Sequence, residues 1–283
     1  MTDGIISFIG GGNMATSLVG GLVADGRDPA SIYVTDVDAA KLEALADAYR
    51  VQTSTDNEEA VSLASAVVLA VKPHIMASVV QGVAVPGKAH RPLFVSIAAG
   101  VRESDILRWL GFDAAIVRSM PNTPSLVGSG ATALYANAFV SQGQRSLAES
   151  VLRAVGLTLW VDDENLLDVV TAVSGSGPAY YFLLMEYMER TGISMGLSKD
   201  DARTLTIQTA FGAAKMALES SDSPATLRTR VASPGGTTER ALDTLMAGGM
   251  EHLIRDAMDA ARDRAGELGN EFGLDAKPEE ANN

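Results

Sequence analysis

The feature that most constrains this chain of 283 residues is a glycine-rich turn near its N-terminus. Residues 4–9 (GIISFI) read as a buried strand, and three consecutive glycines lead from it into helical spacing over residues 13–24. A strand, a G-x-G-x-x-A turn and a helix open a dinucleotide-binding βαβ unit, in which amides at the helix N-terminus face the phosphates. A plain structural turn is the alternative. The context favours dinucleotide binding by Gly10, Gly12, Asn13 and Met14.

The rest of the first half alternates short apolar runs with helical spacing. The runs at 31–36, 66–71 and 92–98 are typical of strands in a parallel sheet, and 114–118, 130–135 and 157–161 are further candidates. This alternation predicts a doubly wound sheet. From about Leu166 the strand signals stop, and helical spacing follows at 180–189, 201–219, 238–246 and 250–266. We expect an α/β, Rossmann-like dinucleotide-binding domain at 1–164, an all-helical domain at 165–272 and a flexible tail at 273–283.

Composition narrows the functional classes. The chain has no cysteine and three histidines, which excludes disulfides, a thiolate site and a cysteine nucleophile, and we expect no metal site. Its net charge of −13 disfavours nucleic acid and anionic membranes as partners. No apolar run has the length of a membrane span and no signal peptide is visible, so the expected location is the cytoplasm.

Several expected helices are apolar on more than one face, most clearly residues 204–218 (TLTIQTAFGAAKMAL). Such helices must be buried, and a domain of this size struggles to bury several of them alone. A helical interface between two copies would bury them, so we expect at least a homodimer.

Asp36 ends the second expected strand. A carboxylate there would accept hydrogen bonds from the adenosine ribose and repel a 2′-phosphate, which favours NADH over NADPH. The alternative is that Asp36 only caps the next helix. The segments 70–73 and 98–100 lie at carboxyl ends of expected strands, where ligands of open α/β sheets bind. For Lys72, a cofactor contact and a solvated surface lysine are equally good interpretations. His74 is interpreted as structural or exposed, and not as a proton donor.

Two glycine-rich turns mark the helical half, at 174–178 (SGSGP) and 233–238 (SPGGTT). Each offers hydroxyls and free amides at a helix N-terminus, which would bind a carboxylate, although both read equally well as helix caps. Neither turn carries an obvious acid or base. Reduction of an imine needs little beyond orientation and electrostatics, and the Thr238 hydroxyl could hydrogen-bond a ring nitrogen.

Taken together, the motifs resemble the pyrroline-5-carboxylate reductase family from about residue 8 to residue 268. The resemblance is carried by FIGGGNMA (8–15), AVKP (70–73), VSIAAG (95–100), MPNTP (120–124), AVSGSGPAY (172–180) and VASPGGTTERAL (231–242). It implies an NAD(P)H-dependent oxidoreductase acting on a C=N group, which reduces the cyclic imine 1-pyrroline-5-carboxylate to proline in the last step of proline biosynthesis. It also implies an all-helical C-terminal dimerisation domain, with dimers that often assemble into decamers.

The resemblance assigns site residues in both halves. It implies that the 233–238 loop cradles the substrate carboxylate, that Thr238 hydrogen-bonds the imine nitrogen, and that one subunit's helical loops cover a partner's cofactor site. Asp36, Arg230 and Thr237 stand where the family varies; NADPH-preferring members tend to have small hydroxyl residues where Asp36 stands. The expected substrate-binding residues are Ser176, Gly177, Ser233, Gly235, Gly236, Thr237 and Thr238. The further cofactor-binding residues, for NADPH or NADH, are Asn57, Val71, Lys72, Pro73, Ala98, Ala99, Gly100, Met120, Pro121 and Asn122.

Two other functions are open. β-Hydroxyacid dehydrogenases share the two-domain build but place a catalytic lysine on the helix after a glycine-rich turn. Here that helix begins AYYFLL at residue 179, and Lys215 lies on a later one. A nucleotide-sensing protein without catalysis would bind the dinucleotide but oxidise none of it.

Overall fold

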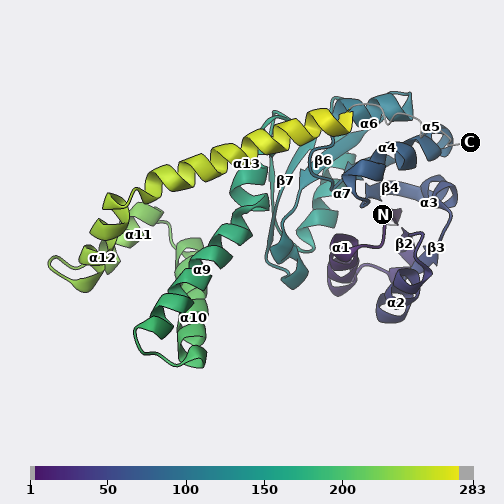
Figure 1. The fold of residues 1–283 in the computed structure, drawn as a ribbon. Coiled ribbons are helices and arrows are strands. Elements are labelled where there is room, and N and C mark those ends of the chain that lie inside the picture. The colour runs from purple at the N-terminus through teal and green to yellow at the C-terminus, as the bar shows by residue number, and fades with distance from the viewer. Residues whose placement is uncertain (1–3, 274–283) are drawn as a thin grey trace, which may run out of the picture. The chain divides into compact units, whose positions relative to one another are not determined.

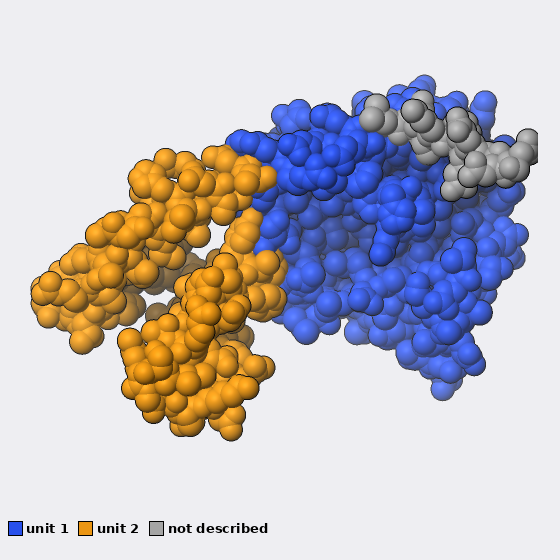
Figure 2. Space-filling model, viewed as in Figure 1, with its two compact units in different colours: residues 1–176, 261–283 blue, residues 177–260 orange. Residues whose placement is uncertain are grey.

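The computed structural model describes residues 4–273, which divide into two compact units (Figure 2). Unit 1 contains the residues up to Ser176 and those from Ala261 onward, and unit 2 is Gly177–Ala260. The boundary expected after residue 164 is placed by a different criterion, the point where strands give way to helices. By that criterion it lies shortly after the last described strand, which ends at Trp160. Apart from Gly273, the tail expected at 273–283 lies outside the described residues.

Unit 1 is built on a sheet of eight strands among the described residues, in the order β3-β2-β1-β4-β5-β6-β7-β8. Figure 1 labels β2, β3, β4, β6 and β7 of this sheet. Every neighbouring pair is parallel except β6 and β7. The Rossmann-like α/β domain expected from the sequence is therefore confirmed. The strands are β1 Ile5–Ile9, β2 Ile32–Thr35, β3 Gln52–Ser54, β4 Ala64–Leu69, β5 Leu93–Ser96, β6 Ile116–Met120, β7 Gly130–Ala136 and β8 Gly156–Trp160.

Helices cover both faces of this sheet, and each face has its own apolar core. Side chains of α1, α2 and α7 fill one core, and those of α3, α4 and α6 fill the other. The helical elements of unit 1 are α1 Asn13–Ala24, η1 Pro29–Ser31, α2 Ala39–Tyr49, α3 Asn57–Leu63, α4 Pro73–Gly82, α5 Ala84–His90, α6 Glu103–Leu110, η2 Thr123–Val127, α7 Gln142–Arg153, α8 Leu166–Val170 and the π-helical turn η3 Thr171–Gly175.

The central strand β4 shows why an unbroken apolar run folds this way. Ala66 and Val68 point into one core, whereas Val67 and Leu69 point into the other, and all four side chains are fully buried. Because successive side chains of a strand alternate between faces, a strand covered on both sides must be apolar at every position.

Two details of the sheet differ from the expectation. Strand β7 runs antiparallel to β6, and the periodicity of a strand does not encode its direction. Strand β3 was not predicted, because it is a polar three-residue strand at the edge of the sheet and carries no apolar signal.

Unit 2 is helical, as expected. A helix at 224–231 was not predicted: the Asp-Ser-Pro break before it is its start, where the Ser223 hydroxyl caps the Thr226 N–H and Pro224 occupies the first turn. Many large apolar side chains of unit 2 are exposed in the single chain, among them Tyr181, Phe182 and Phe211. Its helices are α9 Gly177–Ser194, α10 Lys199–Glu219, α11 Pro224–Val231, α12 Thr237–Ala247 and the first part of α13 Met250–Gly273.

Within the described residues, no helix is long and apolar enough to cross a membrane.

Candidate active site

The phosphate-binding turn lies between β1 and α1. Gly10 has φ +104°, and a Cβ there would lie 2.7 Å from the Ala70 carbonyl oxygen, so only glycine fits. A Cβ on Gly12 would meet nothing within 4 Å. No side chain caps the N-terminus of α1, which begins at Asn13, so its first amides are open to an anion. The tight turn at Gly10 and the uncapped N-terminus of α1 are the two features that pyrophosphate binding requires.

Asp36 follows β2 and lies against this turn. Its Oδ2 accepts a hydrogen bond from the Gly11 N–H at 2.8 Å, its Oδ1 accepts one from the Asp38 N–H at 2.9 Å, and Lys41 Nζ lies 3.6 Å from Oδ2. Burial opposes ionisation, but these two hydrogen bonds and the lysine together hold the pKa of Asp36 below its usual value. The cap of α2 is Asp38, which accepts a bond from the Ala40 N–H.

Asn57 lies near Asp36, at the start of α3. Its Oδ1 accepts a hydrogen bond from the buried Thr35 hydroxyl at 2.6 Å. Asn57 also lines a cavity of about 480 Å³ with side chains of α4, including Ser78 and Val79. The structure thus brings both residues expected on the adenosine side to the carboxyl end of β2.

The segments after β4 and β5 lie at the same edge of the sheet. Val71 and Pro73 are half-buried, while Lys72 and His74 are exposed, and no described residue forms a hydrogen bond or ion pair with their side chains. Ala98 and Gly100 are buried, and Gly100 has φ +74°. A Cβ on Gly100 would lie 3.3 Å from Leu268 and Phe272 of α13, so this loop packs on the part of α13 that belongs to unit 1.

The MPN segment at the end of β6 contacts the SGSG motif directly. The Asn122 side-chain amide donates to the Ser174 carbonyl at 3.2 Å and lies 3.1 Å from its hydroxyl, while Asn122 Oδ1 accepts from the Ala131 N–H at 2.9 Å. Pro121 is buried and Met120 is half-buried. The Asn122 side chain is committed to protein contacts, which leaves the backbone of this segment to face a ligand.

The expectation of an open glycine-rich turn at 174–178 is wrong. The chain is almost continuously helical here, through α8, the π-helical turn and α9, and the Ser176 N–H donates to the Thr171 carbonyl at 2.8 Å. A Cβ on Gly175 would overlap Met120 Cε. Gly175 therefore permits close packing and does not make a turn. Ser176 ends this segment in unit 1, and Gly177 opens α9 in unit 2.

The SPGGTT segment of unit 2 does form a loop before a helix. Gly235 has φ +71°, the Gly236 N–H donates to the Ser233 carbonyl at 2.9 Å, and α12 begins at Thr237 with no side-chain cap. Thr237 is exposed and Thr238 is half-buried; no described residue hydrogen-bonds the Thr238 hydroxyl. The first amides of α12 and this hydroxyl remain available to a carboxylate and a ring nitrogen.

Sequence reasoning missed three contacts of these candidate residues. Lys41 lies beside Asp36, Ser174 contacts Asn122, and the Glu239 carboxylate accepts a hydrogen bond from the Gly235 N–H at 2.6 Å. Only the last had a signal, since an acidic residue at the third position of a helix often reaches back to the residues before it.

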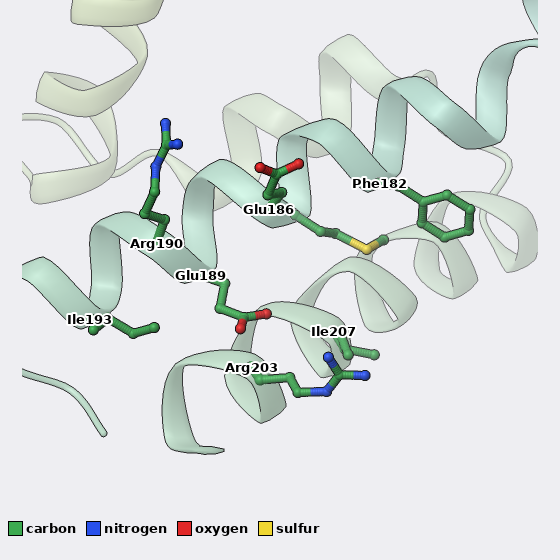
Figure 3. A pocket seen from close by; sticks show the side chains of 8 residues that line it. Phe182, Glu186, Glu189, Arg190, Ile193, Arg203 and Ile207 are labelled. Atoms are coloured by element: carbon green, nitrogen blue, oxygen red, sulfur yellow. The ribbon is translucent and has the colours of Figure 1, made fainter. Parts of the chain in front are cut away.

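Unit 2 also has a groove of about 540 Å³ between α9 and α10 (Figure 3). Apolar side chains from both helices line it, together with four charged ones. Among the described residues, no hydrogen bond or ion pair joins the acidic and basic side chains of this groove. Its lining is Phe182, Met185, Glu186, Glu189, Arg190, Ile193, Arg203 and Ile207.

A chain that combines a Rossmann-like unit carrying an open phosphate turn with a helical unit carrying a hydroxyl- and glycine-rich loop has the parts of a nicotinamide-dinucleotide-dependent oxidoreductase. Residues 164–268 match the family model described as pyrroline-5-carboxylate reductase dimerisation, and residues 5–100 match that of the NADP oxidoreductases, coenzyme F420-dependent. The chain is 49% identical to pyrroline-5-carboxylate reductase of Pseudomonas aeruginosa over 95% of this chain and 98% of the relative. This chain belongs to the pyrroline-5-carboxylate reductase family.

Solved structures agree with this assignment. The pyrroline-5-carboxylate reductase of Coxiella burnetii superposes with a TM-score of 0.91 at 46% identity, covering 94% of this chain and 99% of that one. The Plasmodium falciparum enzyme, solved with NADP bound, has a TM-score of 0.83 at 26% identity and covers 95% and 99% of the two chains.

Proposed function

We propose that this protein reduces 1-pyrroline-5-carboxylate to L-proline with NADH or NADPH, the last step of proline biosynthesis. The observation that carries the proposal is its 49% identity, along nearly its whole length, to a reductase of that name. The open phosphate turn and the loop before α12 are the two ligand sites that such a reaction needs.

The dinucleotide is assigned to unit 1. Gly10 closes the turn, the amides at the start of α1 hold the pyrophosphate, and Asp36 and Asn57 lie on the adenosine side. When bound, the reduced nicotinamide supplies the hydride. The proposed lining of the rest of its site is Val71, Lys72, Pro73, Ala98, Ala99, Gly100, Met120, Pro121 and Asn122.

The substrate is assigned to the loop before α12. The first amides of α12 hold its carboxylate, because the positive end of a helix dipole stabilises an anion. The ring nitrogen takes a proton from solvent to form the iminium, and the Thr238 hydroxyl oxygen accepts a hydrogen bond from this N–H while the neighbouring carbon gains the hydride. Orientation and this one hydrogen bond suffice, since an iminium is already strongly electrophilic. The proposed lining also includes Ser176, Gly177, Ser233, Gly235, Gly236 and Thr237.

NADH is the dinucleotide that we infer to be preferred. Asp36 is ionised at neutral pH, because its pKa is lowered, and its side chain is only 10% exposed. A 2′-phosphate placed beside a fixed carboxylate would be repelled, whereas ribose hydroxyls could donate hydrogen bonds to it. Lys41 offsets part of this charge but is already paired with it.

The proposal for the assembly is supported by unit 2. The match to a dimerisation model indicates that the chain associates with copies of itself. We infer a homodimer, in which a second copy covers the exposed apolar side chains of α9 and α10 that border the groove of Figure 3. A decamer of such dimers is the larger assembly that the family resemblance suggests.

Steady-state kinetics with the purified full chain, synthetic 1-pyrroline-5-carboxylate and each reduced dinucleotide in turn would test the reaction. The proposal predicts oxidation of the dinucleotide together with formation of proline in equal amounts. Binding of the dinucleotide without its oxidation would instead support a nucleotide-sensing protein.

A further inference from the structure

Unit 1 holds an ionic cluster that lies outside the dinucleotide turn. The guanidinium of Arg118 on β6 pairs with the carboxylate of Glu164 at 2.7 Å, and the Arg118 side chain is only 6% exposed. We propose that Glu164 is a positioning residue, which keeps the cofactor-lining segments 98–100 and 120–122 in place relative to each other. The proposal rests on the dinucleotide site assigned above.

A single oxygen of Glu164 joins two elements. Glu164 Oε1 accepts a hydrogen bond from Arg118 Nη1 at 2.7 Å and another from the backbone N–H of Glu103 at 2.7 Å. Glu103 begins α6, three residues after Gly100, and Arg118 precedes Met120 by two residues. The carboxylate therefore fixes the end of one cofactor-lining loop against the strand that leads into the other.

A second carboxylate of the cluster, that of Glu103, extends this connection to the end of β7 and the start of β6. Glu103 Oε1 accepts a hydrogen bond from Asn137 Nδ2 at 2.8 Å. Asn137 in turn accepts one from the Ile116 N–H at 3.1 Å and donates one to the Ala114 carbonyl at 2.9 Å. The start of β6, the end of β7 and the start of α6 are thereby tied together.

The loop after β5 is held from its other side by α13. A Cβ on Gly269 would lie 3.0 Å from Arg102 Nε and 3.3 Å from the Gly100 carbonyl oxygen, so the helix and loop backbones approach closely there. The loop is thus held between this helix and the Glu164 carboxylate. Loss of the Glu164 contact would release one of the two supports.

Several acidic groups lie near Arg118, and Glu164 is the one that pairs with its guanidinium. Asp168 also faces this cluster, but burial raises the pKa of its carboxyl, against the opposing effect of Arg118 and Arg102. Burial and the nearby carboxylates of Glu164, Glu103 and Asp163 raise the pKa of Tyr135. Of these acidic groups, only Glu164 has a hydrogen bond to the guanidinium among the described residues.

The test compares Glu164→Ala, Glu164→Gln and the control Glu149→Gln in the full chain. Glu149 is also a partly buried carboxylate paired with an arginine, Arg153, but it lies on α7 beside Trp160. We would measure dinucleotide affinity by fluorescence without imine, thermal stability, and kcat and KM with imine. Dinucleotide affinity measured without imine reports the effect of the Glu164 substitutions even if the proposed substrate is wrong.

The expected result is about a tenfold weaker dinucleotide affinity for Glu164→Ala, since small displacements of binding segments are costly. Glu164→Gln keeps an oxygen for the Glu103 N–H and should recover part of the affinity, and Glu149→Gln should bind like the wild type. Wild-type dinucleotide affinity in Glu164→Ala would overturn the proposal. So would an equal loss of dinucleotide affinity in Glu164→Gln and Glu149→Gln when the two variants have lost the same stability. Should Glu164→Ala not fold, wild-type affinity in Glu164→Gln would overturn it as well.

Discussion

Asp36 Oδ2 and the Gly11 N–H form a hydrogen bond of 2.8 Å, which links the end of β2 to the phosphate-binding turn. The residue that would select the dinucleotide is therefore attached to the turn that would hold its phosphates. Loss of the Asp36 charge should alter the choice of dinucleotide, while an amide oxygen at the same position can preserve the link.

Asp36→Asn should raise the ratio of NADPH to NADH use by about tenfold in kcat/KM, because removal of one repelling charge is worth roughly 1–2 kcal/mol at a partly buried site. Asp38→Asn is the matched control, since Asp38 caps α2. An unchanged ratio in Asp36→Asn would show that Asp36 does not face the ribose.

Gly10→Ala should lower stability, whereas Gly12→Ala should lower dinucleotide affinity at unchanged stability. Alanine at position 10 must adopt φ +104° and meet the Ala70 carbonyl, so the free energy of unfolding should fall by about 1–2 kcal/mol or more. Alanine at position 12 has room and a negative φ, so stability should be retained while dinucleotide affinity falls, because the methyl group stands at the start of α1. Denaturant unfolding and fluorescence titration measure the two quantities. Normal dinucleotide affinity in Gly12→Ala would contradict the assignment of the turn.

Thr238→Ala should lower kcat/KM by about 1–3 kcal/mol of transition-state stabilisation, the value of one buried hydrogen bond. Thr238→Ser should recover most of the loss. Thr244→Ala is the control on the same helix, because its hydroxyl bonds the Arg240 carbonyl within α12. Full activity in Thr238→Ala would remove this hydroxyl from the mechanism.

Asp168→Asn should raise thermal stability at neutral pH. Burial raises the pKa of Asp168 in the folded protein, so the ionised carboxyl costs stability. This cost is absent below the unfolded pKa, develops as pH rises from that value through the folded pKa, and is complete above it. The difference between variant and wild type should therefore vanish in acid and reach its maximum at neutral pH. A variant that is less stable at neutral pH would show that the attraction of Arg118 and Arg102 outweighs burial.

Phe182→Asp should weaken self-association. Phe182 on α9 is 63% exposed in the single chain, and a charge placed in an apolar interface is costly. Phe139→Asp, on unit 1 with a side chain 47% exposed, is the control. Sedimentation should show a smaller species for Phe182→Asp only. A monomeric wild type would contradict the homodimer.

The sequence predicted the structure correctly wherever a local pattern is compatible with only one local structure. The apolar run of β4 and the glycine turn after β1 each predicted what the structure contains. The Ser174–Pro178 motif was misread because glycine serves both turns and close packing, and only the presence of Met120 distinguishes the two. The Asn122–Ser174 and Arg118–Glu164 contacts join residues 52 and 46 positions apart, which no local pattern could reveal.

The most direct test of the proposed reaction is a crystal structure of the full chain with a dinucleotide and a proline analogue bound. We expect the carboxylate of the analogue on the first amides of α12 and its ring nitrogen within hydrogen-bonding distance of the Thr238 hydroxyl. An analogue bound away from the loop at 233–238 would contradict it.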